Sequence, residues 1–305
     1  MKSTQSEVNY KSKPGVTAAI VTYRREKILL DTIEYLLNQI PAADEILVVD
    51  QTEHHQEATI KSLTTWSQQR KIRLLALEHP SITGAMNNAL VHARHELVVF
   101  VDDDVKPEPN FFRAHINAHK KTGATLVAGR VIQPWQEGKD FRDDEHFHMA
   151  CTRAQWAKEF IGCNFSVNRQ MALELGGFDE CFVHVAYRYE AEFANRMFAA
   201  GQKIYFEPAA CLHHLKVKSG GTRSFGEHLK TVKPSHSVGE YYYLLRAKNE
   251  PDRLKRFFIT PLRSVITKHH LKHPWWIPLM LLSQILGMLW SVWLYVTGPK
   301  YVKLG

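Results

Sequence analysis

The first two hundred residues alternate between continuous apolar runs and stretches with helical spacing of apolar positions. The apolar runs predict strands at residues 16–21, 45–49, 72–77 and 97–101, and a later run at 203–206 predicts one more. The stretches between the first four predict helices at residues 27–38, 58–70 and 84–94. Continuous apolar runs, as opposed to alternating ones, indicate strands that are buried on both faces. The order therefore predicts an α/β fold with a mostly parallel sheet flanked by helices.

Three aspartates follow the strand predicted at 97–101. Ligands of such sheets bind at the carboxyl ends of the strands, so this position is informative. Residues two apart in extended chain face the same way, so Asp102 and Asp104 can converge on one point while Asp103 faces elsewhere. Two converging carboxylates suit Mg²⁺ or Mn²⁺ shared with substrate phosphates. A solvated acidic turn is the alternative reading of these residues.

Composition and charge narrow the classes of partner. The chain has 305 residues, 45% of them hydrophobic and 23% charged, which is typical of a globular protein, and its net charge of +8 favours anionic partners. It contains neither G-x-G-x-x-G after a strand nor G-x-x-x-x-G-K-[ST], which argues against a dinucleotide oxidoreductase and a P-loop enzyme. The four cysteines have no C-x-x-C spacing and indicate buried residues in a reducing compartment. The polar start of the chain has no signal-peptide core, so we expect the catalytic part in the cytoplasm.

The character of the chain changes after about residue 230. Basic residues accumulate first, and then residues 275–296 contain no charged side chain over about the length of a bilayer crossing. Trp275, Trp276, Trp293 and Tyr295 near its ends fit the aromatic belts of a membrane segment. The pattern predicts a membrane anchor that either spans the bilayer or lies in its interface. A buried core helix is the alternative.

Five short motifs then carry a resemblance to a known family. They are AIVTYRR at 19–25, EILVVD at 45–50, GAMNNAL at 84–90, LVVFVDDD at 97–104 and GGFDE at 176–180. In this order they resemble motifs of family 2 glycosyltransferases with the GT-A fold, over about residues 15 to 215. The resemblance implies a nucleotide-diphospho-sugar transferase that requires a divalent cation, Mn²⁺ or Mg²⁺.

The resemblance also implies roles for single residues. The nucleotide-sugar site would comprise Thr22, Tyr23, Arg24, Asp50, Asn87, Asp102 and Asp103. Of these, Thr22, Tyr23 and Arg24 would frame the base and ribose, and Asp50 would accept a hydrogen bond from the base. The metal would be held by Asp102, Asp104 and His214.

The general base is implied by the segment YEAEFANR at 189–196. Glu190 occupies the position of the family's catalytic aspartate, and Glu192 is the rival candidate. Two positions depart from the family pattern: Tyr189 replaces an acid, and Met86 stands where an arginine is frequent. The Q-x-x-R-W motif of processive synthases is absent after Glu190, which favours addition of a single sugar.

We therefore expect a polar tail at 1–14, a catalytic domain at 15–230, a basic juxtamembrane region at 231–274, an anchoring helix at 275–297 and a tail at 298–305. The predicted activity is inverting transfer of one sugar to a hydroxyl of a lipid-linked or envelope polysaccharide acceptor. The expected partners are the donor, this acceptor and the membrane, with no nucleic acid. A catalytically degenerate nucleotide-sugar-binding scaffold and a nucleotidyltransferase are the alternatives.

Overall fold

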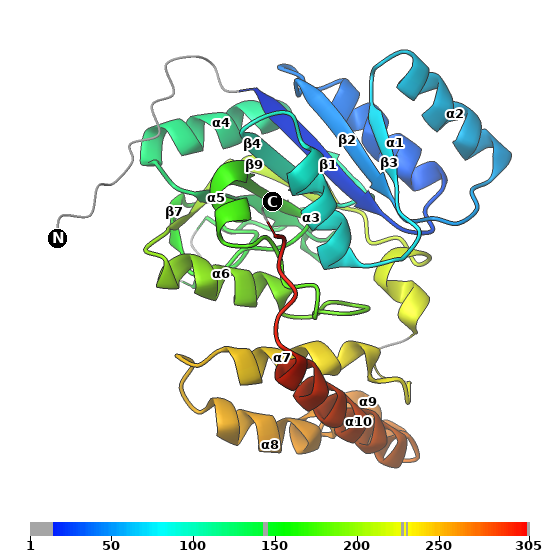
Figure 1. Ribbon diagram of the computed structural model, residues 1–305, viewed down its shortest axis with the longest axis vertical. Helices are drawn as coiled ribbons and strands as arrows, with labels where there is room; N and C mark the ends of the chain where they lie inside the picture. The colour runs from blue at the N-terminus through cyan, green and yellow to red at the C-terminus, as the bar shows by residue number, and fades with distance from the viewer. Residues whose placement is uncertain (1–14, 143–145, 227–228, 230, 304–305) are drawn as a thin grey trace.

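A nine-stranded mixed sheet forms the centre of the molecule (Figure 1). The structure is a computed structural model that describes residues 15–142, 146–226, 229 and 231–303, so the predicted tail at 1–14 lies outside the described residues. The strands are β1 (Val16–Thr22), β2 (Glu45–Asp50), β3 (Arg73–Ala76), β4 (Leu97–Val101), β5 (Val105–Pro107), β6 (Leu126–Ile132), β7 (Gln155–Ala157), β8 (Asn164–Asn168) and β9 (Ile204–His214). The helices are α1 (Lys27–Leu37), α2 (Glu57–Gln68), α3 (Ile82–His92), α4 (Phe111–Thr122), α5 (Arg169–Glu174), α6 (Tyr189–Ala199), α7 (Val238–Arg246), α8 (Arg253–Val265), α9 (Lys268–Lys272) and α10 (Trp276–Thr297).

The strand order is β3-β2-β1-β4-β8-β6-β9-β5, with β7 paired to β9. Strands β3, β2, β1 and β4 are parallel to one another, as the continuous apolar runs predict. The second half is mixed, because β8 runs antiparallel between β4 and β6 while β6 and β9 are parallel. The α/β class is confirmed, and β5, β6, β7 and β8 are the strands that the sequence patterns did not predict.

Helices cover both faces of the sheet and enclose two hydrophobic cores. Helices α1, α2 and α4 pack on one face, where Leu29, Ile33 and Phe112 are fully buried. Helices α3, α5 and α6 pack on the other, where Ala85, Phe193 and their neighbours join a larger core. Helix α3 begins at the cap residue Ser81, whose hydroxyl accepts a hydrogen bond from the Gly84 N–H at 3.1 Å. The four cysteines are free, and three of them are buried.

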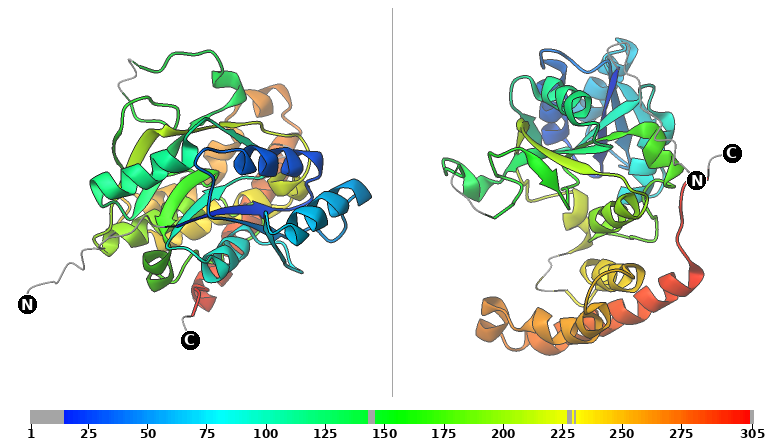
Figure 2. Two further views of the ribbon diagram at one scale, coloured as in Figure 1. Left: turned by 90° about the horizontal axis from the view of Figure 1, so that it is seen from above. Right: turned by 90° about the vertical axis from the view of Figure 1, so that its left-hand side faces the viewer.

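Helices α7 to α10 form a separate layer beside the domain that contains the sheet, on the side of α6 (Figures 1 and 2). Helix α10 packs along α7 and also contacts α8. Among the described residues it is the one helix long and apolar enough to cross a membrane, judged by length and composition alone. After α10 the chain turns at Gly298 and returns to the domain that contains the sheet, where the N–H of Val302 donates to the Gly176 carbonyl at 2.8 Å.

Candidate active site

The acidic turn lies between β4 and β5, at the carboxyl end of the parallel strands. Strand β4 ends at Val101, and β5 begins at Val105 beside the last residue of β9, His214. The neighbouring strand β1 ends at Thr22. This register brings residues from three distant parts of the sequence to one edge of the sheet. Asp102, Asp104 and His214 meet there, as the sequence implied for a metal site.

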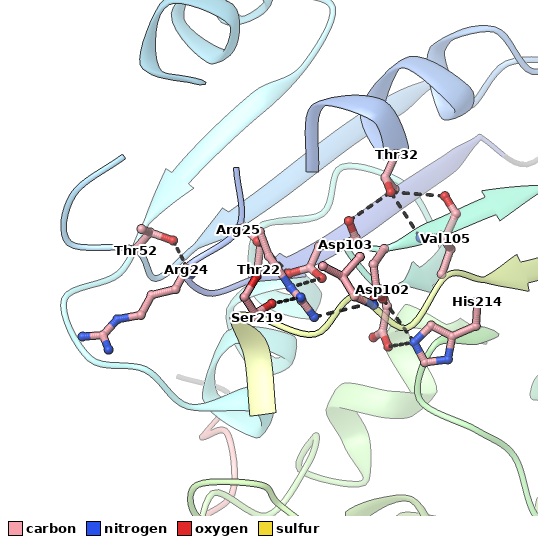
Figure 3. Close-up of polar contacts among 12 residues, drawn as sticks. Thr22, Arg24, Arg25, Thr32, Thr52, Asp102, Asp103, Val105, His214 and Ser219 are labelled. Carbon is pink, nitrogen blue, oxygen red and sulfur yellow. Dashed lines mark hydrogen bonds and ion pairs between the residues drawn. The ribbon is translucent and has the colours of Figure 1, made fainter. Parts of the chain in front are cut away.

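Asp103 points away from this meeting point and into the protein (Figure 3). Its carboxylate accepts a hydrogen bond from the Thr22 hydroxyl at 2.8 Å and one from Arg25 Nε at 3.0 Å. Arg25 Nη2 also lies 3.5 Å from Asp104 Oδ2, and Arg25 Nη1 donates to the carbonyl of Ser219. Arg25 therefore neutralises part of the acidic turn and ties it to the segment that follows β9.

Asp102, Asp104 and His214 form a group with the donor set of a cation site. One ligand atom from each side chain lies within 4.8 Å of the other two. His214 Nε2 is 3.1 Å from Asp104 Oδ1 and 3.7 Å from Asp102 Oδ2. Its Nδ1 atom is buried and has no hydrogen-bond partner among the residues that the structure describes. Carboxylate oxygens with one imidazole nitrogen suit Mn²⁺, and the oxygens alone suit Mg²⁺.

The charges of this group reinforce one another. Burial acts to lower the pKa of His214, but the hydrogen bond to Asp104 and the charges of Asp102 and Asp104 outweigh it and raise the pKa. Burial acts to raise the pKa of Asp104, but the hydrogen bond and charge of His214 and the charge of Arg25 lower it overall. Burial raises the pKa of Asp103 to about 7, against the charge of Arg25. The cluster therefore favours a positive charge at the place where Asp102 and Asp104 converge.

A cavity opens next to these carboxylates and is lined by both aromatic and charged side chains. The rings of Tyr23 and Phe225 stack with their centroids 6.4 Å apart, and His184 lies edge-on to Phe225 at 4.9 Å. Lys216 and Arg223 bring two positive charges to the same cavity. The other polar or charged lining residues include Thr22, Arg25, Gln51, Ser81, Asp102, Asp103, Asp104, Tyr189, His214 and Thr222. The aromatic rings are suited to stack on a base, the two basic side chains to bind a diphosphate, and the acidic turn to bind a divalent cation.

Glu190 stands in the first turn of α6 and does not itself line the cavity, but its neighbours Tyr189 and Gly162 do. The pKa of Glu190 rises to about 7 because the carboxylate is buried; the backbone N–H groups of Glu190 and Gly162 oppose the shift, and the charge of Asp102 adds to it. A side chain at Gly162 would meet the Tyr189 hydroxyl at 1.9 Å and Glu190 Oε1 at 3.2 Å. Glycine is therefore the residue that lets the chain pass this close to the two side chains.

Three residues that the resemblance assigned to the donor do not line this cavity. Arg24 has a φ of 54°, and its exposed side chain points away from the acidic turn to pair with Glu53 at 3.2 Å (Figure 3). Asp50 is buried, and its Oδ2 lies 2.6 Å from Nε2 of His55. Asn87 accepts the Phe178 N–H at 2.7 Å and donates to the Phe178 carbonyl at 2.8 Å. In this structure Asn87 holds the turn of the GGFDE motif.

The rival base, Glu192, is committed to an ion pair. Its carboxylate accepts hydrogen bonds from Arg196 at 2.8 and 2.9 Å, and the side chain is buried. The hydroxyl of Tyr301, from the tail behind α10, donates to it at 3.3 Å. Glu190 is thus the carboxylate of this segment that stands beside the cavity.

Sequence reasoning overlooked several residues of the cavity. Arg25 was noted only as part of a motif, although it is the arginine that binds the acidic turn. Lys216, Arg223 and Phe225 lie in the loop after β9, where no regular pattern marks them. The signal that could have found them is the run of basic residues that directly follows His214.

The fold and the acidic cavity define an α/β enzyme of the GT-A type. The sequence model described as "Glycosyl transferase family 2" matches residues 17–190, which is more than half of the chain. The chain belongs to this family and is a glycosyltransferase. A comparison with curated protein sequences finds no match.

Solved structures with a similar fold come from distant glycosyltransferases. One is GalNAc-T7 with UDP, GalNAc and Mn²⁺, with 13% identity and a TM-score of 0.63 over 83% of this chain and 51% of that one. The chain thus spans about half the length of that protein. Another is TarS 1-349 of S. aureus in complex with UDP-GlcNAc, with 13% identity and a TM-score of 0.58 over 93% and 92% of the two chains. A third is the mannosyltransferase PcManGT of Pyrobaculum calidifontis with GDP-Man and Mn²⁺, with 17% identity and a TM-score of 0.54 over 95% and 81%.

Proposed function

We propose that the chain transfers a single sugar, with inversion, from a nucleotide-diphospho-sugar to a hydroxyl of a lipid-linked or envelope polysaccharide acceptor. The observation that carries this proposal is the convergence of Asp102, Asp104 and His214 in a cavity that Glu190 adjoins. The similar folds that hold UDP, UDP-GlcNAc or GDP-Man, two of them with Mn²⁺, support a donor of this class.

A divalent cation, Mn²⁺ or Mg²⁺, would be held by Asp102, Asp104 and His214 and would offset the negative charge of the donor's diphosphate. Lys216 and Arg223 line the same cavity and are suited to contact the departing nucleoside diphosphate. Tyr23 and Phe225 offer their ring faces to the base. Thr22 and Arg25 keep Asp103 in place, and thereby fix the turn that carries the two metal ligands.

Glu190 is the general base of the proposed reaction. The acceptor oxygen forms a bond to the anomeric carbon as the bond to the diphosphate oxygen breaks, and the hydroxyl proton passes to the Glu190 carboxylate. A pKa of about 7 lets this group hold the proton in the transition state and release it afterwards at neutral pH. Glu192 already balances Arg196, so its participation would leave a half-buried arginine without its carboxylate partner.

The position of the C-terminal layer supports the proposed acceptor class. Trp290 of α10 packs edge-on against His184 at 5.2 Å, and His184 lines the cavity. The apolar helix predicted to associate with the membrane is thus one residue away from the reaction site. This proximity favours an acceptor held by the membrane. The basic residues before α10 favour the cytoplasmic side for the catalytic domain, because the cytoplasmic leaflet carries the anionic lipids that attract such residues.

A panel of nucleotide-sugars, each with Mn²⁺, Mg²⁺ or chelator, tests the proposal. We expect one donor to raise the melting temperature and to be hydrolysed slowly in the presence of the cation. A Glu190→Gln variant is expected to keep the thermal shift and lose transfer. Binding of a donor without turnover by the unaltered chain would instead identify a catalytically degenerate nucleotide-sugar-binding scaffold.

A further inference from the structure

Helix α10 has its polar side turned inward and its large apolar side turned outward. Its buried residues include Ser283, Gln284, Gly287 and Ser291. Gln284 accepts a hydrogen bond from the Tyr241 hydroxyl at 2.6 Å, and the Ser283 hydroxyl donates to the Lys233 carbonyl at 3.0 Å. The outward side instead exposes Leu282, Leu289 and Trp293, at 48%, 65% and 60%. A helix of a water-soluble protein would show the reverse arrangement.

Helix α8 adds a second apolar stripe to the same layer. Leu254, Phe258 and Leu262 follow each other at intervals of four residues and are 56%, 68% and 60% exposed. Such spacing places the three side chains on one face of the helix. The adjacent side of the helix is anchored by Phe257, whose ring lies edge-on to that of Tyr241 at 5.3 Å. The two helices pack against each other, on the side of the layer away from the sheet (Figures 1 and 2).

Basic side chains accompany these apolar stripes. Lys255 and Arg263 are exposed on α8, and Lys268 and Lys272 are exposed on the short helix α9 that leads to α10. The described residues 253–297 contain no aspartate or glutamate. Glu250 and Asp252 lie at the start of α8, beside Lys255. An apolar surface with a mainly cationic border complements a bilayer that carries anionic headgroups.

The chain behind α10 fixes the orientation of this helix. The N–H of Lys300 donates to Asp179 at 3.0 Å, the N–H of Glu180 donates to the Lys300 carbonyl at 2.9 Å, and Val302 bonds to Gly176 at 2.8 Å. A spanning helix of 22 residues would carry its last residue about 33 Å across the bilayer, away from the catalytic domain. The three hydrogen bonds could not form if α10 crossed the bilayer, because the tail would then lie on the other side of the membrane.

We infer that α8 and α10 lie flat in the interface of an anionic lipid bilayer and that α10 does not cross it. The exposed leucine, phenylalanine and tryptophan side chains enter the acyl boundary, while Lys255, Arg263, Lys268 and Lys272 contact the headgroups. The inference deepens the membrane association proposed above and rests on it, but it is independent of the sugar-transfer chemistry. In this arrangement the protein is bound to one leaflet, and the cavity lies close to the lipid surface.

Vesicle flotation of the full chain tests the lipid partner. We expect binding to vesicles of phosphatidylcholine mixed with phosphatidylglycerol, and weaker binding to phosphatidylcholine alone. Phe258→Glu should lower the partition coefficient roughly tenfold or more, and Lys268→Gln with Lys272→Gln should lower it about fivefold per position on the anionic vesicles. Ile60→Glu is the matched control, because Ile60 is an apolar residue of α2 that is also about half exposed, at 51%.

Three results would overturn the inference that the partner is a lipid bilayer. Two come from flotation: Phe258→Glu binds vesicles as well as the unaltered chain does, or the chain binds both vesicle types equally. The third is a chain that does not bind vesicles and forms a dimer in detergent that Phe258→Glu dissociates. Donor hydrolysis in detergent separates this inference from the proposed activity. If the chain hydrolyses the donor but does not float with vesicles, the proposed activity stands and the membrane inference fails. If it floats but does not hydrolyse any donor, the membrane inference stands and the proposed activity fails.

Labelling with a membrane-impermeant maleimide tests the orientation of α10. Lys303→Cys and Lys61→Cys place thiols on the tail and on α2, and the unsubstituted protein serves as the blank. We expect both thiols to react when the reagent is added outside vesicles that carry the protein on their outer surface. Reaction at position 61 with protection at position 303 would show that α10 spans the bilayer.

Discussion

Arg25 donates from Nε to Asp103 Oδ1 at 3.0 Å, and the two side chains are only 6% and 7% exposed. The same guanidinium reaches Asp104 and the carbonyl of Ser219. A planar, forked donor is suited to hold three acceptors in one arrangement, which a lysine cannot do. Arg25 therefore stabilises the acidic turn against its own repulsion and keeps the loop after β9 beside the cavity.

Replacing Arg25 by methionine should destabilise the protein by about 3–5 kcal/mol, because it leaves a buried carboxylate without its partner. Arg25→Lys should recover only part of that loss. Thermal unfolding of the apo protein measures both. Arg24→Met is the control, since the neighbouring arginine is exposed and pairs with Glu53 at the surface. Equal melting temperatures for Arg25→Met and Arg24→Met would contradict a structural role for the buried pair.

The acidic turn could be predicted from the sequence because its position depends on local order alone: an apolar strand, then three aspartates. The choice between Arg24 and Arg25 could not, because it depends on the backbone at Arg24, whose φ of 54° turns one side chain outward and the next inward. Asp50 is a similar case. Its covering by His55 requires the chain after β2 to fold back over the strand end.

In the C-terminal part, too, local sequence predicted the element but not its contacts with distant residues. Apolar length predicted α10 within one or two residues, but length does not distinguish a spanning helix from one that lies in the interface. That distinction arises from Lys300 and Val302, whose backbone bonds join residues more than a hundred positions apart. The antiparallel strand β8 and the loop of Lys216 and Arg223 were missed because they carry neither an apolar run nor a motif.

A cation should stabilise the protein through Asp104. Mn²⁺ at a hundred times its dissociation constant would add about 2.7 kcal/mol to the free energy of unfolding, and Asp104→Asn should abolish this increase while it preserves the size of the side chain. Melting temperatures with Mn²⁺ and with chelator give the measurement. Asp140→Asn, which alters an exposed carboxylate paired with Arg142, should keep the full response. A Mn²⁺ response that survives in Asp104→Asn would place the cation elsewhere.

From the raised pKa of Glu190 we expect activity to rise with pH and stability to fall with pH. Transfer needs the carboxylate, so kcat should rise with pH and level off above about 7, or somewhat lower once a cation on Asp102 removes part of the repulsion. The folded protein binds a proton that the unfolded chain has released between pH 4.5 and 7, so stability falls as pH rises through that range.

Glu190→Gln should therefore be inactive, yet more stable than the unaltered protein at pH 8, with the difference vanishing toward pH 5. Glu192→Gln should lose stability at pH 8, because Arg196 then lacks its partner. Transfer rates and melting curves across this pH range separate the two carboxylates. A Glu190→Gln variant that is less stable at pH 8 would mean that the carboxylate is ionised and paired in the folded state.

Gly162 should be sensitive to the addition of a single methyl group. The new Cβ would lie 1.9 Å from the Tyr189 hydroxyl, so the ring must move and carry the start of α6 with it. Displacement of a catalytic group by about 1 Å costs on the order of a hundredfold in rate, and we expect that loss in kcat with little change in donor affinity. Tyr189→Phe added to Gly162→Ala removes the clashing oxygen and should restore part of the rate. No restoration in the double variant would argue that the hydroxyl contact is not the cause.

The tail behind α10 should contribute to the stability of the catalytic domain through Tyr301. Its ring lies 4.5 Å from the guanidinium carbon of Arg196, its hydroxyl accepts a hydrogen bond from Arg246 at 2.7 Å, and its Cβ approaches Gly176. Tyr301→Ala removes the aromatic contact and both hydrogen bonds of the hydroxyl and should cost about 2–4 kcal/mol, in the range of large-to-small changes. Tyr301→Phe retains the ring over Arg196 and should cost about 1–2 kcal/mol, because the hydrogen bonds to Arg246 and Glu192 are both lost.

Chemical unfolding in detergent measures both Tyr301 variants, with Lys303→Ala as a control on an exposed residue of the same tail. Loss of the tail contact should also free α10 from the catalytic domain, so the thiol of Val302→Cys, which is half-buried beside Gly177, should react faster in Tyr301→Ala than in the parent. A Tyr301→Ala protein with unchanged stability and unchanged labelling would show that the tail does not hold α10 in the orientation that the structure gives it.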